Sequence, residues 1–176
     1  MQIKALSVAA CLAVAAFAAH ADWKPSGFFV QGGVADHSAY GLHAGLVWPW
    51  DWRYDPGRGL VTAQTEASLG QWSGRSATGR VTFTQGVLQP IFRYNFDKSA
   101  TGWFAEGGIG LSYTDQIYIT STKTFSTRFN FADTVGAGYN FGAHEVGLRV
   151  THYSNGSIKR PNPGENFLQL RYGMKF

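Results

Sequence analysis

Hydrophobic and polar positions alternate with a period of two along most of the chain after residue 22. Because successive side chains of a strand point to opposite faces, such alternation indicates strands with one apolar and one polar face. No stretch in this part shows a sustained apolar period of 3.6 residues, so the pattern does not predict helices. Turn-rich segments separate eight alternating stretches: residues 28–34, 42–50, 61–69, 88–96, 103–113, 129–141, 146–154 and 168–176.

Stretches of about ten residues with aromatic side chains near their ends are typical of the smallest outer-membrane β-barrels. Only a closed barrel leaves no unpaired strand edge in lipid, so a complete and even set of strands is required. The sequence therefore predicts an all-β fold, an eight-stranded antiparallel transmembrane β-barrel. A periplasmic β-sandwich is the alternative fold, because its strands alternate in the same way.

Charged residues occupy the polar parity of these strands, which a barrel would enclose. An eight-stranded barrel is just wide enough inside for packed side chains, and a lone buried charge is costly. We therefore expect an ion-pair network among Glu66, Arg93, Glu106, Arg149 and Arg171. Asp133 instead interrupts an apolar face, and we expect a bulge or a polar contact there.

The direction of the strands follows from their even number. The terminal aromatic residue Phe176 resembles the assembly signal of bacterial outer-membrane proteins. With both ends periplasmic, the stretch 146–154 runs outward. We then expect long external loops at 73–82 and 114–125 and short periplasmic turns at 97–101 and 142–144, whereas 51–59 is long for a periplasmic turn.

The N-terminal segment has the features of a secretory signal peptide. Lys4 precedes a short apolar run, and Ala19-His20-Ala21 is a small-x-small cleavage site. The run is shorter than the ~20 residues that a membrane-spanning helix needs. We predict a cleaved signal peptide at 1–21 and a single barrel domain at 22–176. Cys11 is the one cysteine, so the mature chain would have neither disulfides nor thiol catalysis.

Composition adds little to this interpretation. Only 15% of residues are charged and 15% are aromatic, and the mean hydropathy is −0.15, which alternating strands produce without a long apolar run. The net charge of +4 is compatible with an anionic surface such as a phosphorylated glycolipid, or with a solvated mix of charges. Nothing in its pattern suggests nucleic acid. His37, His43 and His144 are too scattered to predict a metal site, and no cofactor is expected.

Candidate chemistry lies at the outer end of the stretch 146–154. His152 and Ser154 share the parity of Val146, Leu148 and Val150, so they would face lipid at the level of the outer leaflet. A hydroxyl beside an imidazole is what nucleophilic acyl chemistry requires. Polar residues at the edge of the apolar belt are the simpler alternative, but the residues that follow favour chemistry.

Roles can be assigned to this cluster. Ser154 would attack an ester carbonyl, His152 would accept its proton, and Glu165 would orient the imidazole. Glu165 has the parity of the interior residues of the last stretch, and Glu106 is a weaker substitute. Further candidates are the oxyanion donors Asn155, Gly156 and Asn162 and the phosphate-binding cations Lys159 and Arg160.

These residues resemble the lipid A 3-O-deacylase (PagL) family of outer-membrane enzymes. The resemblance is carried by His152-Tyr153-Ser154-Asn155-Gly156-Ser157-Ile158, followed by Asn162-Pro163-Gly164-Glu165. It implies an eight-stranded barrel with a Ser–His–Glu triad on its outer surface, and metal-free hydrolysis of the ester-linked acyl chain at the 3-position of lipid A. His152 and Ser154 carry over directly, Glu165 takes the third role, and Asn162 matches the oxyanion-hole asparagine. A one-residue difference in loop spacing would place Asn166 in the third role instead.

The leading hypothesis is therefore an outer-membrane esterase that removes a 3-hydroxyacyl chain from lipid A. A glycerophospholipid esterase with the same residues, and a non-catalytic barrel for adhesion or structure, are the alternatives. The expected partners are lipopolysaccharide of the outer leaflet and membrane lipids, but no nucleic acid. A homodimer is left open.

Overall fold

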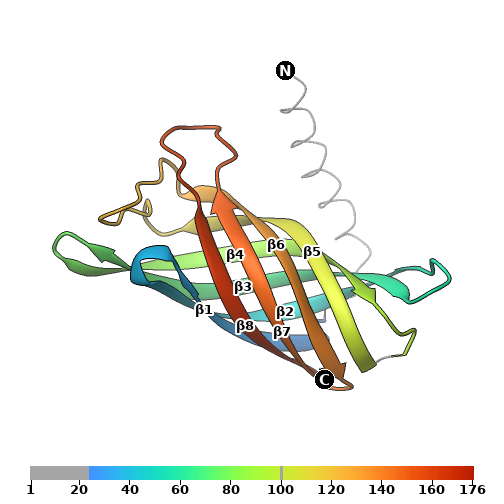
Figure 1. Cartoon of the computed structure of the whole chain (residues 1–176). Coiled ribbons are helices and arrows are strands. Elements are labelled where there is room, and N and C mark those ends of the chain that lie inside the picture. The colour runs from blue at the N-terminus through green and yellow to red at the C-terminus, as the bar shows by residue number, and fades with distance from the viewer. Residues whose placement is uncertain (1–23, 100) are drawn as a thin grey trace.

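A closed barrel of eight antiparallel strands makes up the protein (Figure 1). The computed structural model describes residues 24–99 and 101–176. The predicted fold class is thereby confirmed, and each strand pairs with its neighbours in the chain while β1 and β8 close the barrel. The predicted signal peptide, residues 1–21, lies outside the described residues and stays a prediction. The strands are β1 (Gly27–Ala35), β2 (Ala39–Tyr54), β3 (Leu60–Ser76), β4 (Gly79–Asn95), β5 (Thr101–Thr114), β6 (Phe129–Phe141), β7 (His144–Ser154) and β8 (Glu165–Lys175).

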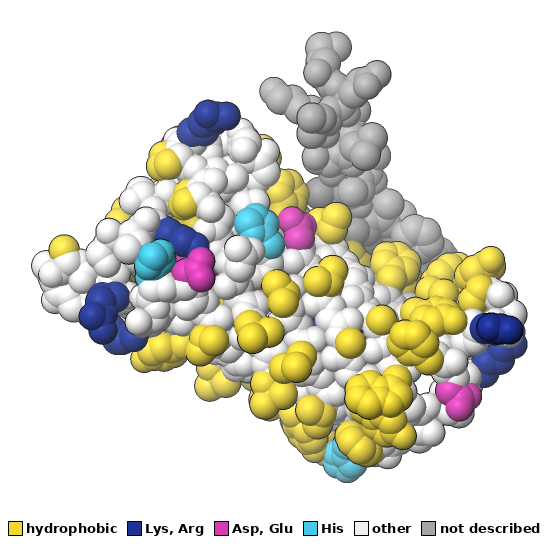
Figure 2. All heavy atoms as spheres, in the orientation of Figure 1, with side chains coloured by type: hydrophobic (Ala, Val, Ile, Leu, Met, Phe, Trp, Pro, Cys, Tyr) yellow, Lys and Arg dark blue, Asp and Glu magenta, His cyan; other side chains and the backbone are white. Residues whose placement is uncertain are grey.

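The period-two pattern sets the two faces of the barrel wall. Leu69 and Leu170 point outward and keep 70% and 60% of their surface exposed, which is what lipid-facing side chains require. Hydrophobic side chains cover the wall in Figure 2, and Lys and Arg side chains stand at its two ends. No helix among the described residues is long and apolar enough to cross a membrane.

Two predicted connections differ from the structure. The segment 73–82 is not a long loop, because β3 and β4 continue to pair as far as Ser76 and Gly79 and form a hairpin that extends beyond the barrel wall (Figure 1). The connection between β2 and β3 is likewise shorter than the expected 51–59, since β2 continues to Tyr54. In the β3–β4 hairpin the backbone donors and acceptors are satisfied by strand pairing, whereas the pairing of β2 with β3 is irregular between Pro49 and Arg53. The long connection between β5 and β6 is a loop, as predicted.

Buried ion pairs fill one part of the interior, as expected from the charged parity. Arg149 bonds Glu66 at 2.7 Å and Glu106 at 2.6 Å, and Arg93 bonds Glu106 at 2.8 Å. Arg171 also reaches Glu66, at 3.0 Å. Glu145 also pairs with Arg93, at 2.7 Å, and it was not expected in the network because it lies just before the predicted stretch 146–154. The network links strands that are distant in the sequence and neutralises charges that could not be buried alone.

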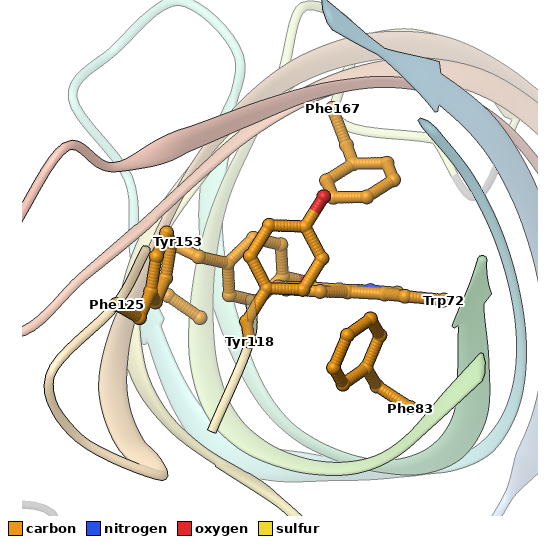
Figure 3. Close-up of a cluster of buried hydrophobic side chains, with 7 residues drawn as sticks. Trp72, Phe83, Tyr118, Phe125, Tyr153 and Phe167 are labelled. Carbon is orange, nitrogen blue, oxygen red and sulfur yellow. The ribbon is translucent and has the colours of Figure 1, made fainter. Parts of the chain in front are cut away.

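An aromatic cluster fills the interior toward the connection between β7 and β8 (Figure 3). Trp72 lies at its centre, with ring centroids 4.6 Å from Tyr153 and 4.8 Å from Phe167. Tyr118, from the β5–β6 loop, packs edge-on against Trp72 at 5.4 Å. Tyr153 is therefore a packing residue of the barrel interior. Because Tyr153 and Phe167 flank the β7–β8 connection, this packing anchors both of its ends.

Substitution of Arg149 tests how much the ion-pair network contributes to the stability of the barrel. Arg149→Ala leaves Glu66 and Glu106 each without one partner, and removing one member of a buried pair typically costs about 3–5 kcal/mol. We expect a clear drop in the midpoint of urea unfolding in detergent micelles. Lys98→Gln is the control, since its pair with Asp55 is half-exposed and exposed pairs contribute little. Equal midpoints for the two variants would contradict a stabilising network.

Candidate active site

His152 and Ser154 lie at the end of β7 on its outward face. They share this face with Leu148 and Val150, which are 57% and 44% exposed, whereas Tyr153 between them is buried inside. His152 is half-buried, and Ser154 is buried at the point where the strand ends and the connection to β8 begins. The structure thus has the predicted base and nucleophile on the same outer face, two residues apart.

The imidazole of His152 is held by a residue of β8 and by one residue of the β7–β8 connection. Its Nδ1 lies 2.7 Å from Oδ1 of Asn166, the residue directly opposite on β8. Because this oxygen is an acceptor, Nδ1 carries the proton and Nε2 is left as the basic nitrogen. Gly164 packs against the ring: a Cβ added there would lie 2.6 Å from Cε1, and its φ of +69° favours glycine.

Glu165 does not contact His152. Strand β8 begins at Glu165, so strand parity already applies there and turns the carboxylate into the barrel. It accepts bonds from Lys123 Nζ at 2.7 Å and from the Tyr118 hydroxyl at 3.0 Å. Burial, reinforced by the Glu165 carboxylate, raises the pKa of Tyr118 and keeps this hydroxyl a donor. Glu165, predicted as the third residue of the triad, thus anchors the β5–β6 loop. Asn166 is the residue that bonds the imidazole instead. The substitute Glu106 belongs to the ion-pair network.

A tight turn follows Ser154 and brings a backbone donor to it. The amide of Ile158 donates to the carbonyl of Asn155 at 3.1 Å, with Gly156 and Ser157 both at positive φ (+60° and +61°). Positive φ at both central residues is the signature of a type I′ turn. As a result the N–H of Gly156 lies 3.4 Å from Ser154 Oγ. The backbone amide of Gly156 is thus adjacent to the Ser154 hydroxyl, and its role as an oxyanion donor stays a prediction.

The two asparagine candidates behave differently. Asn155 uses its side-chain amide to hold neighbouring segments, with Nδ2 bonded to Ser126 Oγ at 3.0 Å and to the carbonyl of Lys159 at 2.8 Å. Its backbone N–H donates to Oδ1 of Asn162 at 3.0 Å. That bond engages the carbonyl end of the Asn162 amide, so its nitrogen is the end that can serve an oxyanion. The Asn155 side chain thus holds neighbouring segments together, and its role as an oxyanion donor stays a prediction. Ser126, its partner in the long loop, had no recognisable signal in the sequence.

An open cavity of about 550 Å³ adjoins this turn. It is bordered by the β5–β6 loop and by the β7–β8 connection, and it contains the candidate Arg160 but not Lys159. Lys123, on the opposite side, is engaged by Glu165 and lies 3.6 Å from Asp36. The lining residues are Thr122, Lys123, Thr124, Ser157, Arg160, Pro161, Asn162 and Pro163.

Asp133 lies next to His152 on the adjacent strand. The β6–β7 register pairs the two residues directly, and pairing with β5 at Ile109 is also regular. The expected bulge is therefore absent, and His152 is the polar residue that lies beside Asp133 in the sheet.

The chain is similar to known proteins in sequence and in fold. A family model described as lipid A 3-O-deacylase (PagL) matches residues 38–175. The lipid A deacylase PagL of Pseudomonas aeruginosa is 30% identical over 145 residues, which cover 80% of each chain. The protein of the same name from Bordetella bronchiseptica is 30% identical over 156 residues, covering 83% of this chain and 84% of that one. A crystal structure of the outer-membrane enzyme PagL superposes with a TM-score of 0.77 at 27% identity, over 86% of this chain and all of that one. The chain therefore belongs to the lipid A 3-O-deacylase (PagL) family, and it is an integral protein of the bacterial outer membrane.

Proposed function

We propose that this protein is an esterase that removes the 3-O-linked hydroxyacyl chain of lipid A on the lipid-facing side of the barrel. Family membership supports the substrate class. The observation that carries the proposal is the outward-facing pair of His152 and Ser154 at the end of β7, with Nε2 left as the basic nitrogen. A lipid in the outer leaflet can reach this face without entering the barrel.

The reaction has two acyl-transfer steps. Ser154 Oγ attacks the ester carbonyl while His152 Nε2 takes the hydroxyl proton, and the carbonyl oxygen becomes an oxyanion. The N–H of Gly156 and the side-chain nitrogen of Asn162 are the proposed donors to that oxyanion. The C–O bond to the sugar then breaks, and the imidazolium protonates the departing alcohol. A water molecule, deprotonated by His152, hydrolyses the acyl-serine and releases the hydroxy acid.

Asn166 positions the base in this scheme. Its Oδ1 accepts the Nδ1–H bond at 2.7 Å and so fixes the tautomer in which Nε2 is unprotonated. An asparagine serves in the same position in Cys–His–Asn hydrolases, where the amide orients the imidazole. The requirement for a correctly oriented base is thereby met without a carboxylate in the β7–β8 connection.

The cavity beside Asn162 is the proposed site for the phosphorylated head group. Arg160 borders it, and guanidinium groups bind phosphate through paired hydrogen bonds. The acyl chain would lie against the outward apolar side chains of β6, β7 and β8. A lipid with a charged head and an apolar tail thus matches the two surfaces that meet at Ser154.

Substitution of the nucleophile and the base tests the proposal. Ser154→Ala and His152→Ala should each reduce deacylation below detection, because residues of such a unit fail together. The measurement is mass spectrometry of lipid A from expressing cells, with loss of one hydroxyacyl mass in the wild type alone. His144→Ala is the control, since His144 lies on the same strand at its other end and bonds Tyr172 at 2.8 Å. A lipid A profile that is unaffected by the wild-type protein would reject the proposed substrate.

Substitution of Gly164 tests whether activity depends on the position of the His152 imidazole. In Gly164→Ala the new Cβ would meet Cε1 of His152 at 2.6 Å, so the ring must move. We expect kcat to fall by about 10- to 100-fold, since displacement of a catalytic group by ~1 Å can cost this much. Gly142→Ala is the matched control, because Gly142 also has a positive φ, of +98°, but has nothing within 4 Å of the added Cβ. Similar losses in both variants would point to backbone strain instead.

Substitutions of Arg160 and Lys159 test whether the cavity binds the phosphates of the head group through Arg160. Arg160→Gln should raise KM for phosphorylated lipid A several-fold and leave KM for a dephosphorylated analogue unchanged, because the cavity loses its exposed cation. Lys159→Gln, one residue away and outside the lining, should leave both values near those of the wild type. The same rise in KM for both substrates would argue against phosphate binding by Arg160.

A further inference from the structure

We infer that Asp133 supplies the negative charge that stabilises the protonated form of His152 during the reaction, while Asn166 supplies only orientation. Asp133 would thus be a positioning residue that acts through His152 from a different strand. This inference rests on the proposed function, since it concerns the charge that His152 acquires when it takes the proton of Ser154.

The need for such a charge follows from the identity of the residue at Nδ1. A carboxylate that accepts the Nδ1–H bond both orients the imidazole and offsets the charge of the imidazolium. The Asn166 amide accepts the same bond at 2.7 Å but carries no charge. His152 is half-buried at an apolar wall, where an uncompensated charge is costly. Asn166 can therefore orient the imidazole, but another group must offset the charge of the imidazolium.

Glu165 cannot perform this task from its position. Its carboxylate is 1% exposed inside the barrel, on the opposite side of the wall from the imidazole. Lys123 neutralises it at 2.7 Å, and the Tyr118 hydroxyl occupies its second oxygen. The interior acids Glu66, Glu106 and Glu145 are committed to arginines of the ion-pair network.

Asp133 is placed where the missing charge is needed. It is the β6 residue directly paired with His152, and side chains so paired on one face of a sheet have Cβ atoms about 4.5–5.5 Å apart. The imidazole thus lies between two strands, with Asn166 opposite on β8 and Asp133 opposite on β6. Each neighbouring strand contributes one of the two functions that a single carboxylate usually combines.

The surroundings of Asp133 provide no structural reason for a carboxylate. Its neighbours on the outward face are Phe131 and Val135 on β6 and Ile109 across on β5. Val135 and Ile109 are each 64% exposed, as lipid-facing residues are. An acidic side chain on such a face destabilises a barrel. A contribution to catalysis accounts for its presence, because the β6–β7 register places Asp133 directly beside His152.

Comparison of two backgrounds separates charge compensation from other roles of Asp133. In the otherwise native protein, Asp133→Asn should lower kcat for release of the hydroxy acid by about 10- to 100-fold with little change in KM, since unit charges at this separation interact strongly near a protein surface. In a protein that already carries Asn166→Glu, the same Asp133→Asn substitution should lower kcat less than about threefold, because a carboxylate now accepts the Nδ1–H bond. Asp133→Glu, which keeps the charge, should retain most of the activity of the wild type.

Several outcomes would overturn this inference. Equal losses of kcat in the two backgrounds, no loss in either, or a rise in KM alone would assign Asp133 to structure or to substrate contact. Asp51→Asn, at the other end of the barrel, is the control for a general effect of charge. If the Asn166→Glu protein does not fold, as judged by its mobility on unheated gels, Asp133→Asn and Asp133→Glu are compared directly, and they must then differ at least about tenfold in kcat.

The same experiment distinguishes failure of the inference from failure of the proposed function. Wild type and Ser154→Ala are assayed alongside, and a wild type that releases no hydroxy acid rejects the function and the inference together. A wild type that depends on Ser154 but is indifferent to Asp133→Asn rejects the inference alone. The rate at which a fluorophosphonate labels Ser154 gives a second readout that does not require lipid A, and it should fall in Asp133→Asn by a similar factor.

Discussion

Closure of the barrel is the constraint on which the rest of the structure depends. Every strand residue within the barrel wall must face either lipid or a crowded interior, because a closed sheet offers no third environment there. A shift of one residue therefore exchanges the two surroundings completely. Glu165 and Asn166 show the consequence: the first is bound inside by Lys123 and Tyr118, and the second meets His152 outside. The chemistry available at the outer wall is set by this parity.

Interior packing holds the strands that carry the site. The ion pairs of Arg149 connect β7 to β3 and β5, and Tyr153 and Phe167 pack on Trp72 at the two ends of the β7–β8 connection. Polar side chains then fasten the loops above this core, as Asn155 does with Ser126. A rigid wall and a fastened loop keep the outer residues in place, which preorganises catalytic groups without a deep pocket.

Two tasks that one residue performs in a Ser–His–Glu triad are divided here between two strands. Asn166 holds the imidazole by a hydrogen bond, and Asp133 lies beside it with a charge. Such a division is open to a barrel because an outward residue has neighbours on both adjacent strands. It also gives a physical reason for the one acidic residue that interrupts the apolar face of β6.

Much of the fold and part of the candidate site could be predicted from the sequence, because alternation, charge parity and the residues from His152 to Ser154 are local patterns. They determined the eight strands, the inward ion pairs and the outward position of His152 and Ser154. Where β8 begins, how far the β3–β4 hairpin extends, and which strands lie beside His152 depend on pairing between distant residues, which no local pattern contains. Tertiary structure alone therefore decided that Asn166 contacts the imidazole, that the Glu165 carboxylate lies inside the barrel, and that Asp133 is the adjacent acid. The reason is that register places residues across strands as well as along them.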